Sequence, residues 1–181
     1  MSKLVEKKIS SQTVYKGDFL DVKKDNVLLP NGEKSTREWI NHPGAVVIVP
    51  ILPNGKIALI RQFRYAMGSM FFELPAGKID KGETSDECAI RELEEEIGFK
   101  TKNLNFIAMI HPAIGFANEN MSLYLATDLV QTNINRDSDE FLELMPTSLE
   151  HALDLVWSNK ITDVKTIIGI LWYQKIYQES K

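Results

Sequence analysis

Three glutamates near the middle of the chain have a spacing that suits phosphate chemistry. Glu92, Glu95 and Glu96 stand at positions i, i+3 and i+4, and on a helix their side chains fall within about one third of the circumference. Carboxylates at these spacings repel one another by roughly 0.2–0.5 kcal/mol per pair, and they stand near the helix C-terminus, where the macrodipole disfavours anions. A hard divalent cation such as Mg²⁺ would offset both effects, because it takes carboxylates, waters and a substrate phosphate as ligands. A solvated acidic face is the alternative that spacing alone leaves open.

The helix that would carry these glutamates has signals at both ends. Thr84 and Glu87 have the spacing of a capping box, and Gly98 marks the C-terminus. An adjoining apolar sector is expected to pack against a sheet: Ala89, Ile90, Leu93 and Ile97. The sequence therefore predicts that the acidic face lies at the border of a core.

Apolar runs and turn residues around this helix predict a strand-rich domain. Expected strands cover 45–52, 56–62, 71–74, 104–110, 121–128 and 141–145. Expected helices cover 149–159 and 163–178, and Thr147 with Glu150 repeats the capping-box spacing at the first of them. Residues 3–42 predict a small N-terminal sheet with a hairpin turn at 30–33. The order favours an α+β fold or a mixed three-layer arrangement.

Length and composition exclude several classes of protein. The chain has 181 residues, of which 44% are hydrophobic and 25% charged, so it can bury a core of its own. A net charge of -4 offers no attraction to nucleic acid or anionic lipid, and no apolar run is long enough to span a bilayer. Cys88 is the single cysteine, and residues 1–8 lead into no secretory signal. We expect a cytoplasmic protein with no nucleic-acid partner and no membrane partner.

The segment around the glutamates contains a longer pattern. Over 23 residues it holds nine places of defined type: Gly77, Glu83, Arg91, Glu92, Leu93, Glu95, Glu96, Gly98 and Phe99. At every one of these places the chain resembles the Nudix box, the motif of the Nudix hydrolases. The resemblance implies the Nudix fold, an α/β/α sandwich with a mixed central sheet, and hydrolysis of a nucleoside diphosphate linked to another moiety.

The same resemblance implies roles for individual residues. The implied metal ligands are Ala76, through its carbonyl, Glu92, Glu95 and Glu96. The metal would be Mg²⁺, with Mn²⁺ as a substitute, and Glu95 and Glu96 would take part in catalysis through it. Arg91 and Glu83 would hold the motif together.

Further segments resemble the ADP-ribose and nucleoside diphosphate sugar pyrophosphatases of this family. They are Arg37-Glu38, His42-Pro43-Gly44-Ala45, Gln62-Phe63-Arg64-Tyr65 and Glu73-Leu74-Pro75-Ala76-Gly77. By this likeness Arg64 would contact the diphosphate, and Arg37 with Glu38 would hold the nucleoside end. Where the ADP-ribose enzymes carry Ser-Pro-Gly, this chain has the run 113–115 with Ala-Ile-Gly, so we expect a range of nucleoside diphosphate sugars. Alternatives are an enzyme for nucleoside triphosphates or dinucleotides, and a binding module without catalysis.

The resemblance also implies a homodimer in which the N-terminal sheets are swapped. Residues 1–43 would form the β arm that dimerises and completes the substrate site, and residues 44–181 the hydrolase domain. An arm of this size has too little core to be stable alone.

The resemblance implies that the general base comes from a loop far beyond the motif. Glu140 is the first candidate and Asp139 the second, in the acidic run before the strand at 141–145. Glu119, expected to lie near the substrate, is the third. A mobile carboxylate suits this role, because the base must approach the attacking water only after substrate binds. A solvated acidic loop is the alternative.

Overall fold

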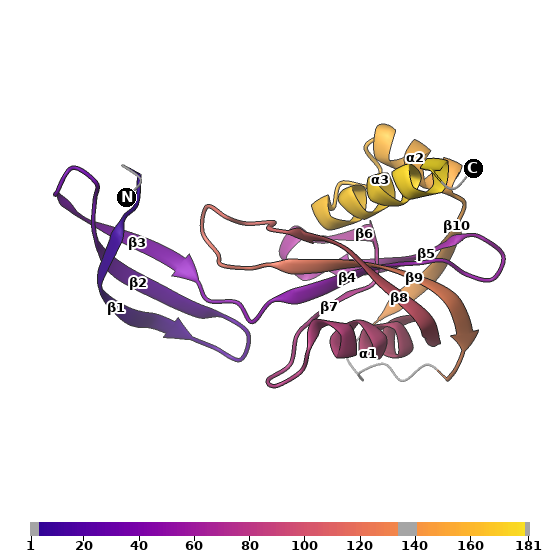
Figure 1. Cartoon of the computed structure of the whole chain (residues 1–181), viewed down its shortest axis with the longest axis horizontal. Helices are drawn as coiled ribbons and strands as arrows, with labels where there is room; N and C mark the ends of the chain where they lie inside the picture. Colours follow the sequence, from indigo (N-terminus) through magenta and orange to yellow (C-terminus); the bar gives the residue numbers. More distant parts are fainter. Residues whose placement is uncertain (1–3, 134–140, 180–181) are drawn as a thin grey trace. The chain divides into compact units, whose positions relative to one another are not determined.

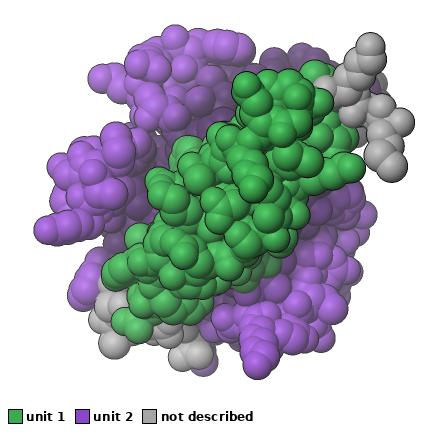
Figure 2. Space-filling view, turned by 90° about the vertical axis from the view of Figure 1, so that its left-hand side faces the viewer, with its two compact units in different colours: residues 1–44, 113–119 green, residues 45–112, 120–181 purple. Residues whose placement is uncertain are grey.

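The computed structural model describes residues 4–133 and 141–179, and the chain forms two compact units (Figures 1 and 2). The first unit comprises residues 1–44 and 113–119, and the second comprises residues 45–112 and 120–181. The first unit is thus built from two separate segments of the chain. The division of roles between residues 1–43 and 44–181 stays a prediction.

The first unit is a three-stranded antiparallel sheet in the order β1-β2-β3. Its strands are β1 (Lys7–Lys16), β2 (Asp21–Leu28) and β3 (Lys34–Ile40). The expected turn at 30–33 joins β2 to β3, and Gly32 there has φ +89°, which favours glycine. Residues 113–119 join this unit through Ile40, whose N–H donates to the Phe116 carbonyl at 2.8 Å. The predicted N-terminal sheet is confirmed.

The second unit contains two sheets. In the first sheet the order is β7 (Ala76–Lys78), β4 (Ala45–Pro50), β9 (Met121–Gln131) and β8 (Phe99–Ile110). The strands β4 and β9 are parallel and the other pairs antiparallel, so the sheet is mixed. In the second sheet the order is β10 (Leu142–Thr147), β5 (Ile57–Arg64) and β6 (Ser69–Glu73). A short 3₁₀ helix, η1 (Tyr65–Met67), links β5 to β6.

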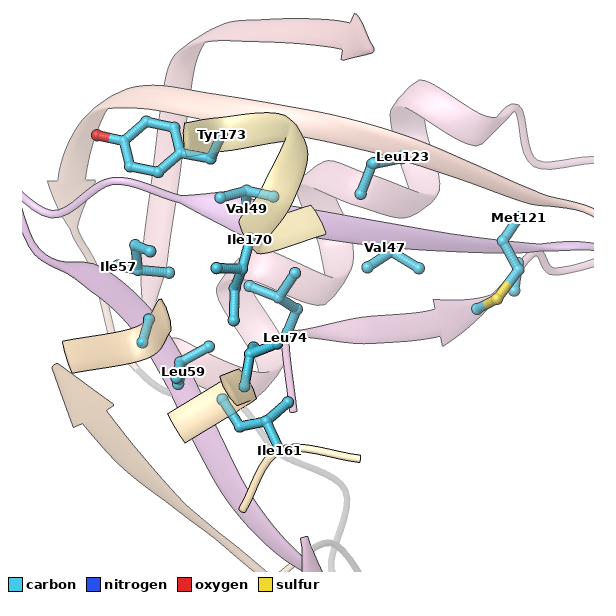
Figure 3. Close-up of a cluster of buried hydrophobic side chains, with 13 residues drawn as sticks. Val47, Val49, Ile57, Leu59, Leu74, Met121, Leu123, Ile161, Ile170 and Tyr173 are labelled. Atoms are coloured by element: carbon cyan, nitrogen blue, oxygen red, sulfur yellow. The ribbon is translucent and has the colours of Figure 1, made fainter. Parts of the chain in front are cut away.

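Helices cover both sides of these strands, as Figure 1 shows. They are α1 (Ser85–Ile97), α2 (Leu149–Trp157) and α3 (Val164–Glu179). Successive residues of β4 point to opposite faces: Val46 and Ile48 pack in the cluster of α1, whereas Val47 and Val49 pack in the cluster of α2 and α3. Figure 3 shows Val47 and Val49 in the second cluster. The three-layer α/β/α arrangement with a mixed sheet is therefore confirmed.

Helix α3 approaches the sheet closely at Gly169. A Cβ atom at this position would lie 2.3 Å from Leu74 Cδ1 and 3.2 Å from Val49 Cγ2. Real side-chain contacts do not come so near, so a residue without a side chain is needed for this packing.

The structure corrects several details of the expected elements. Helix α2 is capped by the Ser148 side chain, which accepts from the His151 N–H, and not by Thr147. Thr147 remains in β10, where it pairs with Ile57 of β5. Ile90, expected in the apolar sector of α1, is 40% exposed, and Cys88 is fully buried in its place. The strand β7 was not among the expected strands.

In the described part of the chain, none of the helices is both long enough and apolar enough to cross a membrane.

Candidate active site

Helix α1 places its carboxylates through well-formed ends. The Thr84 side chain accepts from the Glu87 N–H, and the Glu87 carboxylate accepts from the Thr84 N–H, so the predicted capping box is confirmed. Gly98 ends the helix with φ +71°, a left-handed conformation that costs glycine little. Of the three acidic residues on the predicted face, Glu92 and Glu96 are only 7% and 3% exposed. The carboxylates are therefore held at the edge of the core by a helix that is fixed at both ends.

Arg91 binds the carboxylates of this segment together. Its Nε and Nη2 donate to the two oxygens of Glu83 at 2.8 and 3.0 Å. Its Nη1 donates to Glu92 Oε1 at 2.7 Å and to Glu95 Oε2 at 2.9 Å. The hydrogen bond from Arg91 is the main reason why the pKa of Glu83 falls to about 2. The prediction that Arg91 and Glu83 hold the motif together is confirmed.

The backbone of Ala76 and Gly77 packs directly on two of the carboxylates. Glu96 Oε2 accepts from the Ala76 N–H at 3.2 Å. A Cβ atom on Gly77 would lie only 1.7 Å from Glu92 Oε1 and 1.9 Å from its Cδ. Glycine at position 77 thus makes the room that the Glu92 carboxylate occupies. The pairing of β7 with β4, in which Ala76 faces Val47, fixes this backbone in the sheet.

Arg64 lies at the end of β5, where its partly exposed guanidinium pairs with a buried carboxylate. Its Nε and Nη2 donate to the two oxygens of Glu73, each at 2.7 Å. Lys165, at the start of α3, donates to Glu73 Oε2 at 2.5 Å. The hydrogen bond that Arg64 donates to Glu73 raises the pKa of Arg64, and the charges of Glu73, Glu96 and Asp163 act in the same direction. The structure therefore brings Arg64 into electrostatic reach of Glu96 on α1.

The donor set of α1 fits a hard divalent cation. Three carboxyl groups, those of Glu83, Glu92 and Glu95, share the guanidinium of Arg91, and Glu96 accepts from the Ala76 N–H. Carboxylate and carbonyl oxygens are the ligands that Mg²⁺ prefers. Among residues 4–133 and 141–179, no three acidic, histidine or cysteine side chains converge as a ready-made metal site. The reason lies in the contacts above, because the carboxylates turn toward Arg91 and the Ala76 N–H.

The other expected substrate residues belong to the first unit. Arg37 and Glu38 are neighbours on β3, so their side chains point to opposite faces of that sheet. Arg37 pairs with Glu6, and Glu38 pairs with Lys24 at 3.1 Å. The structure thus places the two expected contacts of the nucleoside end on different faces of the arm.

Glu119, also in the first unit, lies near a buried histidine. Its Oε1 is 3.8 Å from Nε2 of His42, whose side chain is 8% exposed. The Gly44 N–H donates to Nδ1 of His42. Glu140 and Asp139, the first two candidates for the general base, lie outside the described residues.

Two residues of the Arg64 network were missed from the sequence. Glu73 was noted only as part of a matching segment, and Lys165 was not singled out. The available signal was the polar run Asp163, Lys165 and Thr166 at the start of a helix that is otherwise largely apolar.

An open depression of about 630 Å³ follows the outer side of α1. It is lined by Glu87, Ile90, Arg91, Glu94, Glu95, Lys100 and Asn133. The depression reaches Glu95 but contains neither Glu92 nor Glu96 among its lining residues. The chemistry of the buried carboxylates therefore belongs to the other side of α1, next to Ala76 and Gly77.

Comparison with known proteins identifies the family. The NUDIX domain matches residues 41–164, and the nucleoside diphosphate sugar hydrolase N-terminal domain matches residues 6–40. Over 176 residues the chain is 40% identical to an ADP-ribose pyrophosphatase of Bacillus subtilis, covering 96% of this chain and 95% of the relative. It is 31% identical to the ADP compounds hydrolase NudE of Escherichia coli, covering 94% and 93%. A crystal structure of an ADP compounds hydrolase superimposes with a TM-score of 0.89 at 25% identity, covering 99% of this chain and 98% of the other. The chain therefore belongs to the Nudix hydrolase family and carries the N-terminal domain of its nucleoside diphosphate sugar hydrolases.

Proposed function

We propose that this chain hydrolyses the diphosphate bond of nucleoside diphosphate sugars, with ADP-ribose as the first candidate, to a nucleoside monophosphate and a sugar phosphate. The observation that carries the proposal is the packing of two buried carboxylates, Glu92 and Glu96, on the backbone of residues 76–77. A diphosphate needs a combination of cation, carboxylates and guanidinium, because its own charge repels an acidic helix. The relatives named ADP-ribose pyrophosphatase and ADP compounds hydrolase support the same substrate class.

Nudix hydrolases generally need a divalent metal, and we propose that this one uses Mg²⁺, with Mn²⁺ able to replace it. The ligands would be Ala76, through its carbonyl, Glu92, Glu95 and Glu96. When bound, the metal supplies a Lewis acid that draws negative charge from the diphosphate oxygens.

The side chains of the protein would bind and orient the substrate and accept a proton from the attacking water. Arg64 would donate hydrogen bonds to the diphosphate, and Arg37 with Glu38 would hold the nucleoside end. A water oxygen forms a bond to one phosphorus, the bridging P–O bond breaks, and the proton of the water passes to a carboxylate. Glu140 is the proposed base, ahead of Asp139 and Glu119.

A substitution tests this assignment of the base. Glu140→Gln should lower kcat by about 10²–10⁴ while KM changes little, because general base catalysis is worth about this much. Turnover close to that of the wild type would remove Glu140 from the mechanism.

We also propose that the chain acts as a homodimer in which the N-terminal sheets are swapped. All ten residues of the edge strand β1 are exposed, among them Ile9, Val14 and Tyr15, which are 52%, 48% and 56% exposed. An edge strand with open hydrogen-bonding groups and apolar side chains favours a partner. Light scattering of the purified chain should give twice the monomer mass, and a monomer would contradict the proposal.

Turnover of a substrate panel tests the proposed activity. The purified chain is incubated with ADP-ribose, other nucleoside diphosphate sugars, nucleoside triphosphates and dinucleotides in the presence of Mg²⁺, and products are separated by chromatography. Release of a sugar phosphate and a nucleoside monophosphate supports the proposal. Release of diphosphate from triphosphates would favour the alternative of an enzyme for nucleoside triphosphates. Binding without turnover would indicate a binding module.

A further inference from the structure

Glu73 is a buried carboxylate that accepts hydrogen bonds from two positively charged side chains. It is 2% exposed, and its two oxygens accept from Nε and Nη2 of Arg64 at 2.7 Å each. Its Oε2 also accepts from Nζ of Lys165 at 2.5 Å. Burial pushes the pKa of Glu73 upward, but the hydrogen bond from Arg64 and the charge of Lys165 outweigh this effect, so the pKa lies below its ordinary value. Glu73 therefore stays ionised between two positive side chains.

The first turn of α3 fixes the second of these cations. Asp163 Oδ2 accepts from the Thr166 N–H at 3.1 Å and from the Thr166 hydroxyl at 2.6 Å, as an N-cap residue does. The same oxygen accepts from Lys165 Nζ at 2.9 Å. Thr166 Oγ1 in turn accepts from the Leu74 N–H at 2.8 Å, next to Glu73 in the chain. Two hydrogen bonds thus join the start of α3 to the end of β6, and the contacts of Asp163 with Lys165 and Thr166 fix the α3 side of this junction.

This cluster is buried at its base and open at one end. The side chain of Lys165 is 11% exposed and that of Glu73 2%, whereas the side chain of Arg64 is 44% exposed. Two of the three guanidinium nitrogens are committed to Glu73, so the plane of the group is set and Nη1 is the nitrogen outside the pair. Burying charges costs free energy that well-packed apolar residues would not, so packing alone gives no reason for this arrangement.

The net charge around Arg64 also depends on Lys165. An Arg–Glu pair alone is neutral and attracts an anionic diphosphate weakly. Lys165 adds a second positive charge, so the charges of Arg64, Lys165, Glu73 and Asp163 balance. Without Lys165, Glu73 and Asp163 would leave a net negative charge beside Arg64.

We propose that Glu73 and Lys165 are positioning residues for Arg64: Glu73 orients the guanidinium so that Nη1 faces the diphosphate, and Lys165 compensates the charge of Glu73. The first turn of α3 is then part of the substrate site, although none of its side chains touches the substrate. This inference rests on the proposed function, in which Arg64 binds the diphosphate.

Steady-state kinetics with ADP-ribose and saturating Mg²⁺ test the proposal through the split between KM and kcat. We expect Lys165→Met to raise KM about tenfold, equal to about 1.4 kcal/mol, with kcat within a factor of two. Lys165→Arg, which keeps the charge, should restore most of the loss. Lys175→Met is the matched control, because Lys175 lies on the same helix in an exposed ion pair with Glu179 and should leave both constants unchanged.

A double-mutant cycle separates positioning from a purely structural role. If Lys165 acts through Arg64, Lys165→Met should add little to KM once Arg64→Met is present. Additive effects of the two substitutions, or an unchanged KM in Lys165→Met, would overturn the proposal. If Lys165→Met does not fold, Lys165→Gln, which keeps a donor without the charge, is measured in its place.

Binding measurements keep this test separate from that of the activity. Calorimetry with α,β-methylene ADP-ribose, whose P–C–P bridge resists hydrolysis, should show about tenfold weaker binding for Lys165→Met. Absence of turnover by the wild type would refute the proposed function, whereas unchanged binding of the analogue to Lys165→Met would refute the positioning role alone.

Discussion

Replacement of Gly77 by alanine should separate activity from stability. The new Cβ would lie 1.7 Å from Glu92 Oε1 and 2.5 Å from its Oε2, so the carboxylate must retreat by about 1.5–2 Å to reach ordinary contact distance. A flexible side chain end can make this movement, and we expect a loss of about 1 kcal/mol or less, or about 2–4 °C in Tm. A displacement of about 1 Å at a reacting centre can lower the rate about 10²-fold. Gly77→Ala should therefore fold and lose at least this much in kcat.

Gly169 supplies the matched control for this substitution. A Cβ there would lie 2.3 Å from Leu74 Cδ1. Leu74 is packed in the core and cannot move aside as the Glu92 carboxylate can. Overpacking costs about 1–3 kcal/mol, and better helix propensity returns about 1 kcal/mol. Gly169→Ala should lower Tm and leave kcat near that of the wild type.

Three measurements on purified protein test the reasoning about Gly77. Thermal unfolding followed by circular dichroism gives Tm, ADP-ribose turnover gives kcat, and titration with Mn²⁺ followed by electron paramagnetic resonance gives metal affinity. Wild-type turnover in Gly77→Ala would refute the view that Glu92 must occupy this place. If Gly77→Ala does not fold, the view that the Glu92 side chain can move aside is refuted.

Three further outcomes follow from the contacts around the site. The pKa of Glu83 lies at about 2 in the folded chain against an ordinary 4.5, so the unfolded state binds more protons between these values and the contribution of Glu83 to stability is lost as pH falls through this window. Tm measured from pH 6 to pH 2 should therefore fall less in Glu83→Gln than in the wild type, and parallel curves would contradict the role of Arg91. Glu96→Gln should lower kcat about 10²-fold or more with a small change in KM, and undiminished turnover would exclude Glu96 as a metal ligand. Thr166→Val leaves the Leu74 N–H without its acceptor and should cost about 1–3 kcal/mol in urea unfolding, whereas an unchanged midpoint would show that another group replaces it.

Local signals made α1 predictable. The capping box at Thr84 and Glu87 and the glycine at 98 act over a few residues each, and the structure begins and ends the helix where they indicate. The same kind of signal failed by one residue at α2, because Thr147 and Ser148 are both good caps. The choice between them was made by pairing with β5, a strand distant in the sequence.

Contacts between distant segments explain what the sequence concealed at the site. The spacing of the α1 glutamates and the pairing of Arg91 with Glu83 lie within one short segment and could be predicted. Glu73 and Lys165 are 92 residues apart, and nothing in either segment indicates the other. The strand β7 has only three residues, too few for alternation, and exists because β4 offers an edge to pair with.

The two-part composition of the first unit restricts how this chain can be recombined with its relatives. Residues 113–119 bond to the end of β3 through Ile40, in both directions, and the Asn118 side chain accepts from the His42 N–H at 2.7 Å. A chimaera that takes residues 1–44 from a relative would keep the native residues 113–119. The hydrogen bonds between these two segments would then no longer match. Exchange of both segments together is the graft that preserves them.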